Sequence, residues 1–313
     1  MSLKVINPFD QSVVCDLSYA DDATVGTALE RARAALASWR ETPLAERIAT
    51  VRRGVDTFRQ NKDAVARDVS AQMGKPILQA RREVDTLVDR AEQSMQTAPA
   101  ALASDELEAR DGFVRRVDHV PLGVVLDIAA WNYPLLIPIN VIVPALLAGN
   151  VVVLKHSAKT PLCGTWFTRA FGLLTPHHLV QDLLLSHAQT DKLVRDPRVD
   201  HVAFTGSVDG GREVYRAASA RFVDVGLELG GKDPAYVAAD ADLDFAVENI
   251  VDGACYNAGQ SCCGVERVYV HENLYEAFVE KSRLAIERYV LGDPMLETTT
   301  LGPLASRLAL TFL

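Results

Sequence analysis

The chain has 313 residues, 49% of them hydrophobic, and its 41 acidic and 32 basic residues give a formal net charge of −9. A chain of this length and composition can bury a sizeable core and has room for two domains, so we expect an ordinary globular protein. The negative charge and the lack of a lysine or arginine block argue against a nucleic-acid partner, because clustered cations dominate binding to phosphates. A small molecule is the expected ligand.

The five cysteines are an odd number, widely spread except for one adjacent pair, and no apolar secretory segment follows the first residue. We therefore expect free thiols and a cytoplasmic location. Residues 120–154 are apolar enough to approach a membrane span, but four prolines interrupt them, and each costs a helix interior roughly 3 kcal/mol. Buried parallel strands joined by turns and a helix explain this run better, so no membrane is expected.

The first hundred residues are helical in pattern. Thr42-Pro43 fits an N-cap followed by a first helical residue, and Gly74-Lys75-Pro76 ends another helix. Residues 77–98 predict a further helix, and we expect its charged residues, Glu83 and Arg90 among them, on the solvent-exposed face.

A strand is predicted at 112–119, where apolar and charged residues alternate. After it, short apolar runs alternate with helical patterns, which is typical of an α/β fold with a parallel sheet. The strands are predicted at 124–129, 151–155, 201–205 and, as a buried strand, 223–227, and the helices at 135–148, 161–174 and 210–220.

Cys262 is a candidate nucleophile. Gly259 shortly before it lets the backbone turn and present the sulfur, and a nucleophilic thiol needs a lowered pKa and access. Nothing in the residues alone separates Cys262 from Cys263. Acyl transfer through a thiol also needs a base that activates water, and Glu228, between a predicted buried strand and two glycines, is the candidate. Asn132 follows another predicted strand, at the position where open α/β sheets bind ligands.

Four segments resemble, in order and spacing, the signature segments of the NAD(P)-dependent aldehyde dehydrogenase superfamily. They are Trp131-Asn132-Tyr133-Pro134, Phe204-Thr205-Gly206-Ser207 with Gly211, Leu227-Glu228-Leu229-Gly230-Gly231-Lys232 and Gly259-Gln260-Ser261-Cys262. The resemblance implies a Rossmann-like cofactor-binding domain at 1–110 and 121–226, an oligomerisation-arm strand at 111–120, and an incomplete α/β catalytic domain at 227–313. It also implies a homodimer or homotetramer for the full-length protein.

The resemblance implies that Cys262, not Cys263, attacks an aldehyde. Asn132 and the backbone N–H of Cys262 would stabilise the oxyanion, and Glu228 would activate water against the thioester, giving a carboxylic acid. We expect a substrate pocket that also includes Leu135 and Leu136, with its main residues Tyr133, Ile137, Asn140, Ser261 and Cys263. No arginine is evident there to bind a substrate carboxylate, so an apolar or neutral aldehyde is favoured.

The cofactor signals differ from the common dinucleotide fingerprint, because no GxGxxG is present. The glycine-rich turn at 206–211 joins a strand to a helix and offers backbone N–H groups to a pyrophosphate. By resemblance, the cofactor-binding residues are Trp131, Lys155, Ser157, Ala158, Gly206, Ser207, Gly211 and Gly230. Many NAD-preferring relatives carry a glutamate at the position of Ala158, so NADP is favoured over NAD, with Ser157 or Lys159 near its 2′-phosphate. No metal is expected.

The resemblance covers essentially all 313 residues, but these correspond to roughly the first two thirds of a family member. We therefore expect the sequence to be a fragment that lacks the family's downstream Glu-x-Phe-Gly-Pro segment. Two alternatives remain beside the dehydrogenase. One is a non-catalytic protein that keeps the fold and binds a nucleotide or a partner; the other is a cysteine esterase that works without hydride transfer.

Overall fold

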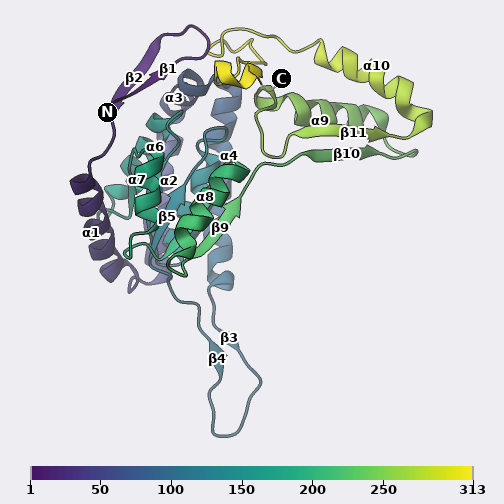
Figure 1. The fold of residues 1–313 in the computed structure, drawn as a ribbon. Coiled ribbons are helices and arrows are strands. Elements are labelled where there is room, and N and C mark those ends of the chain that lie inside the picture. The colour runs from purple at the N-terminus through teal and green to yellow at the C-terminus, as the bar shows by residue number, and fades with distance from the viewer. Residues whose placement is uncertain (1, 312–313) are drawn as a thin grey trace.

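The computed structural model describes residues 2–311, and its main feature is a five-stranded parallel sheet in the order β7-β6-β5-β8-β9 (Figure 1). The strands of this sheet are β5 (Val124–Ile128), β6 (Val151–Lys155), β7 (Val180–Asp182), β8 (His201–Thr205) and β9 (Asp224–Glu228). Every residue of β5 and β6 is buried, which explains their mainly apolar character, with Asp127 and Lys155 as the exceptions. The strands predicted at 124–129, 151–155 and 201–205 are confirmed, and the fold is α/β as expected.

The α-helices that surround the sheets are α1 (Asp22–Trp39), α2 (Leu44–Gln60), α3 (Lys62–Met73), α4 (Ile77–Ala101), α5 (Leu136–Leu147), α6 (Pro161–Phe167), α7 (His187–Val194), α8 (Val208–Ser219), α9 (Leu243–Cys255) and α10 (Tyr275–Ile286). A π-helical stretch at Thr168–Gly172 continues α6, and short 3₁₀ turns occur at Tyr256–Gly259, Glu272–Leu274 and Arg307–Thr311.

Helix ends follow the local chemistry of the chain. Gly74 ends α3 in the left-handed conformation with φ 80°, as its place after the helical pattern predicts. The start of α2 differs by one residue from the prediction, because Pro43 is the N-cap and Leu44 the first helical residue. Proline fixes φ but its extended ψ keeps it outside the first turn here.

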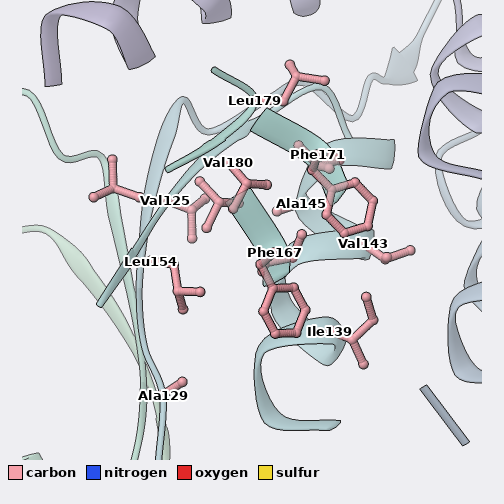
Figure 2. Close-up of a cluster of buried hydrophobic side chains, with 14 of the residues drawn as sticks. Val125, Ala129, Ile139, Val143, Ala145, Leu154, Phe167, Phe171, Leu179 and Val180 are labelled. Atoms are coloured by element: carbon pink, nitrogen blue, oxygen red, sulfur yellow. The ribbon is translucent and has the colours of Figure 1, made fainter. Parts of the chain in front are cut away.

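The crossovers place helices on both faces of the main sheet. β6 lies on one side of β5 and β9 on the far side of β8, so right-handed connections put α5 and α8 on opposite faces. Figure 2 shows Val125 and Leu154 of the sheet facing Ile139 of α5 and Phe167 of α6. This apolar layer holds the strands rigidly, and their carboxyl ends meet at one edge.

Strand β9 corrects one expectation. The prediction of a buried strand at 223–227 is wrong in its burial, because β9 is the edge strand of the sheet and four of its five residues are exposed. It pairs with β8, and α8 packs against it. Glu228, the last residue of β9, is therefore exposed and not a buried strand-end carboxylate.

A second, smaller unit follows the main sheet. Strands β10 (Asp233–Val237) and β11 (Val265–Val270) form a parallel pair, and α9 and α10 pack together beside them (Figure 1). Val237, Val247, Val251 and Phe278 form its core, separate from the main hydrophobic core. The domain boundary expected near residue 227 stays a prediction.

Two hairpins complete the structure. Strands β1 (Ser2–Ile6) and β2 (Val13–Ser18) pair at the N-terminal side. Strands β3 (Asp105–Glu106) and β4 (Arg116–Val117) form a two-stranded arm that extends away from the sheet (Figure 1). The strand predicted at 112–119 is thus only two residues long, and beyond it the two limbs of the arm meet in an isolated bridge between Arg110 and Phe113.

Among residues 2–311, no helix has the length and apolar character needed to cross a membrane. The apolar run at 120–154 consists of β5, α5 and β6, as predicted, although Pro144 lies inside α5 and does not end it.

Candidate active site

The carboxyl edge of the main sheet brings three candidate segments together. Ile128 at the end of β5 pairs with Lys155 on one side and Phe204 on the other, so the turns that follow β5, β6 and β8 are neighbours. Thr205 pairs with Glu228, which adds the end of β9 to the same edge. Side chains that lie far apart in the sequence therefore border one region of the surface.

Cys262 lies in the loop between the 3₁₀ turn Tyr256–Gly259 and β11, and it is exposed. Three successive residues before it have positive φ: Asn257 with 54°, Ala258 with 56° and Gly259 with 72°. Only glycine adopts this region freely, and an alanine there stores about 1–2 kcal/mol of strain. The loop thus adopts a conformation that its own sequence does not favour, and the surrounding contacts hold it there.

The chemistry of the Cys262 thiol differs from the expectation of a lowered pKa. Partial burial raises the pKa of Cys262 above its usual range, and the neighbouring Cys263 adds to the shift. Cys263 is also exposed, and its sulfur lies 3.3 Å from the Ser261 hydroxyl. The described groups therefore favour the neutral thiol, and a base is needed to generate the thiolate.

Glu228 reaches the same region from β9. The backbone N–H of Gly206 donates to the Glu228 carbonyl over 3.0 Å, which fixes the strand end against the glycine-rich turn. Three residues on, a Cβ added to Gly231 would lie 3.1 Å from the Cys262 carbonyl oxygen. The segment that carries the candidate base and the loop that carries the candidate nucleophile are thus in contact.

Asn132 lies in the turn between β5 and α5. Its backbone carbonyl accepts hydrogen bonds from Lys75 Nζ at 2.9 Å and from Asn257 Nδ2 at 3.0 Å. Asn257 Nδ2 also donates to the Gln260 carbonyl at 3.1 Å, so one side chain joins the Asn132 turn to the Cys262 loop. Within residues 2–311 the side-chain amide of Asn132 makes no hydrogen bond, which leaves it available to a ligand.

The expected substrate-pocket residues come from α5, the turn before it and the Cys262 loop. Burial raises the pKa of Tyr133, whose phenol interacts with the Ser261 hydroxyl. Asn140 and Arg90 are both exposed, and Asn140 Oδ1 accepts a hydrogen bond from Arg90 Nη1 at 3.2 Å. Arg90 comes from α4, which packs along α5, so an arginine that was not evident from the sequence lies beside one of the expected pocket residues.

The candidate cofactor residues surround the same edge. Lys155 is buried at the end of β6, where burial lowers its pKa and nearby Asp182 opposes the shift. Its ammonium has no hydrogen-bond or ion-pair partner in the described part of the chain. Lys159 Nζ lies 4.2 Å from the ring centroid of Trp131, and the Ser157 hydroxyl accepts from the Lys159 N–H at 3.2 Å. This donor set fits an oxygen-rich ligand such as a ribose phosphate.

The glycine-rich turn leads into α8, with Ser207 as its N-cap. The Ser207 hydroxyl accepts from the Gly210 N–H at 3.2 Å, and a Cβ added to Gly211 would lie 2.6 Å from Leu229. The positive end of the α8 dipole therefore faces the carboxyl edge of the sheet. Gly230 has open space around it, and Ala158 is half-buried beside Ser157.

Residues 1–312 match the model of the aldehyde dehydrogenase family. The chain belongs to the aldehyde dehydrogenase family. Succinate-semialdehyde dehydrogenase [NADP(+)] 1 of Mycobacterium tuberculosis is 33% identical over 309 residues, which are 98% of this chain and 68% of the relative. The fold and the superfamily expected from the four signature segments are confirmed.

Solved structures agree. The structure of Gox0499 has a TM-score of 0.95 at 32% identity, and the match covers 100% of this chain and 69% of that one. Succinic semialdehyde dehydrogenase from Streptococcus pyogenes, in complex with NADP+, has a TM-score of 0.92 at 30% identity, covering 99% and 68%. The chain thus spans about two thirds of the length of these members of its family.

Proposed function

We propose that the chain carries the active site of an NAD(P)-dependent aldehyde dehydrogenase, in which an aldehyde is oxidised to a carboxylic acid through Cys262. The observation that carries the proposal is the link through Asn257, which joins the turn of Asn132 to the loop of Cys262. Family membership supports the reaction class.

In the proposed mechanism, Glu228 removes the thiol proton of Cys262, directly or through water, because the raised pKa of Cys262 leaves little thiolate at neutral pH. The thiolate sulfur then forms a bond to the aldehyde carbon. The carbonyl oxygen becomes an oxyanion, which the Asn132 amide and the Cys262 backbone N–H stabilise.

The nicotinamide cofactor, when bound, supplies the acceptor for the hydride that leaves the thiohemiacetal carbon. Lys155, Ser157, Trp131, Gly230 and the N-terminal turn of α8, whose N-cap is Ser207, would hold the cofactor at the sheet edge. Gly206 and Gly211 would allow that turn to pack closely against Phe204 and Leu229. The product on Cys262 is a thioester. Glu228 first releases the thiol proton to solvent and then accepts a proton from water as the water oxygen attacks the thioester carbon. The bond from that carbon to the sulfur breaks, the carboxylic acid leaves, and the Cys262 thiolate takes the proton from Glu228.

The proposed substrate is an aldehyde that carries a carboxylate at its other end. Arg90 supports this, because a guanidinium held by the neutral amide of Asn140 is suited to bind a carboxylate. The names of the relatives, succinate-semialdehyde dehydrogenases, support the same class. This replaces the preference for a neutral aldehyde.

The proposed cofactor is NADP. Ala158 leaves no carboxylate beside the ribose, Ser157 and Lys159 are close by in the same turn, and the relatives from Mycobacterium tuberculosis and Streptococcus pyogenes are named or solved with NADP+. A binding module without turnover and a cofactor-independent esterase are the competing functions.

The test is turnover of succinate semialdehyde by the purified chain, followed by the absorbance of reduced NADP. We expect Cys262→Ala to abolish turnover and Cys263→Ala to retain most of it, because one sulfur alone can face both the carbonyl and the oxyanion donors. Equal losses in the two variants would contradict the assignment of Cys262. Binding of the cofactor without turnover would favour the non-catalytic binding protein. Hydrolysis of an ester without cofactor would favour the esterase.

A further inference from the structure

Three polar side chains form a buried stripe along α4 and the turn before it. Lys75, Gln79 and Glu83 have exposed fractions of 1%, 8% and 3%. Their spacing of four residues puts them on one face of the helix. This corrects the expectation that Glu83 lies on the exposed face of the helix. We call these three residues the α4 polar stripe.

One part of the α4 polar stripe holds the turn that carries Asn132. Lys75 Nζ forms a buried ion pair with Glu83 Oε2 and donates to the Asn132 carbonyl at 2.9 Å. Glu83 Oε1 accepts the backbone N–H groups of Leu135 at 2.9 Å and Leu136 at 3.3 Å. A single ion pair thus binds backbone groups at both ends of the turn.

The other part of the stripe holds the loop that carries Cys262. Gln79 Oε1 accepts the backbone N–H of Asn257 at 3.1 Å, and Gln79 Nε2 donates to the Thr300 carbonyl at 3.2 Å. Asn257 has the positive φ described above, and its side chain binds the Asn132 carbonyl. Gln79 therefore supports a strained backbone whose side chain closes the connection between the two loops.

We propose that the α4 polar stripe positions the Asn132 amide relative to the Cys262 sulfur, and that Lys75, Gln79 and Glu83 are positioning residues for the oxyanion of the reaction. None of the three would touch the substrate. The kinetic part of this inference rests on the proposed function. Buried charges are costly unless paired and hydrogen-bonded, and here each hydrogen-bonding partner outside the pair belongs to the backbone of the Asn132 turn.

The test removes the ion pair without leaving an unpaired buried charge. In Lys75→Met/Glu83→Gln the shapes are nearly kept, and the glutamine oxygen can still accept from Leu135. We expect kcat to fall by about 100-fold while KM changes by less than about 3-fold, because a displacement on the order of 1 Å is felt in the transition state rather than in substrate binding. In an Asn132→Ala background the same double substitution should change kcat by less than about 3-fold, because both act through one amide.

Amide hydrogen exchange gives a second readout that needs no turnover. Exchange of the backbone amides at Asn132, Leu135 and Leu136 should accelerate in the double variant, because a neutral glutamine accepts more weakly than the carboxylate and the Asn132 carbonyl loses Lys75. Exchange of Val143, further along α5, should not accelerate. The control is Asp85→Asn, which breaks the exposed Lys62–Asp85 ion pair on another face of α4. It should leave both kcat and exchange unchanged.

If the double variant does not fold, Gln79→Met keeps the ion pair. It should lower kcat to a smaller degree and accelerate exchange of the Asn257 amide, whose N–H Gln79 accepts, rather than exchange of the Leu135 and Leu136 amides. Unchanged exchange, unchanged kcat, additive losses with Asn132→Ala, or an equal loss in Asp85→Asn would each overturn the proposal. A wild-type chain that oxidises no aldehyde would refute the proposed function, and accelerated exchange in the variant would then still support the positioning of the turn.

Discussion

Asp127 lies in the middle of β5 with an exposed fraction of 0%, and neither carboxylate oxygen has a hydrogen-bond partner among the residues the structure describes. Burial raises its pKa well above the ordinary 3.8. Since the folded state then holds a proton that the unfolded state has released, this group favours folding most at low pH. Its contribution declines as the pH rises through the pKa of the folded state. Burial also raises the pKa of Asp182, to about 7, with the same sign.

We expect Asp127→Val to raise the free energy of unfolding by about 1–3 kcal/mol at neutral pH, because it removes a buried polar group without a partner. The gain should shrink as the pH falls toward and below 3.8, the ordinary pKa of the carboxyl, because the unfolded wild type then becomes protonated as the folded one already is. Urea unfolding of both proteins at several pH values measures this. Asp16→Val in the exposed part of β2 is the control, and a gain for Asp127→Val that is independent of pH would contradict the account.

Ala158 follows Ser157 in the turn expected to bind the cofactor ribose. Ala158→Glu places a carboxylate beside the ribose, where it accepts hydrogen bonds from the two hydroxyls of NAD and repels the 2′-phosphate of NADP. We expect a shift in preference toward NAD of about 1–3 kcal/mol, the range of one charge-assisted contact. Titration of both cofactors, read by protein fluorescence, measures it. If the wild type strongly prefers NAD and the variant shows no shift, residues other than Ala158 determine the cofactor specificity.

At the scale of elements, the sequence predicts what depends on local pattern. The runs at 151–155 and 201–205 are strands with those bounds, because short, mainly apolar runs between turns are typical of strands in a covered parallel sheet. The exposure of β9 could not be predicted, since it depends on the neighbours of the strand in the sheet. The prediction put Glu83 on the exposed face of the helix because its partner, Lys75, precedes the helix and was interpreted only as part of a helix end.

The same limit applies to the site. Cys262, Glu228 and Asn132 lie in recognisable sequence segments. The roles of Arg90 and Asn257 become visible only in the structure, where α4, α5 and the Cys262 loop are in contact. The spacing of Lys75, Gln79 and Glu83 was the one available signal for the α4 polar stripe. Helical spacing of three polar residues is common on exposed faces, so the spacing alone did not indicate burial.

Helix α4 also supports a prediction on the substrate. We expect Arg90→Met to raise KM for succinate semialdehyde by about 10-fold to 100-fold, since a hydrogen bond to a charged group contributes about 1.5–3 kcal/mol. KM for an uncharged aldehyde of the same length should stay unchanged in the same variant, and Arg90→Lys should restore part of the loss. An equal rise in KM for both aldehydes would mean that Arg90 stabilises the helix and does not bind the substrate carboxylate.

At the scale of the molecule, the arm of β3 and β4 is the most exposed part. Val114 is 89% exposed, and Phe113, Val120 and Leu122 are exposed with it. Apolar side chains in this number are unusual on a surface that contacts only water. We therefore propose, as the sequence suggested, that residues 111–120 form an oligomerisation arm. Because the arm lies outside the core, a substitution in it can change association without changing the stability of the fold.

We expect Val114→Asp to leave the melting temperature of the monomer within about 1 °C of the wild type, because exposed substitutions away from the core change stability by less than about 0.5 kcal/mol. The self-association constant from sedimentation equilibrium should fall. Val13→Asp in the exposed part of β2 serves as the control for added charge. A loss of thermal stability without a change in association would refute a role of the arm in assembly.

The carbonyl of Asn132, shared by Lys75 and Asn257, has a practical consequence. The main chain of this residue is fixed by its neighbours, while its side chain takes no part in holding the fold. Asn132→Ala therefore deletes an amide without disturbing the scaffold, and the mutated chain should still accept an aldehyde and a dinucleotide together. Such a protein is suited to crystallisation of the ternary complex, since its ligands persist during crystal growth.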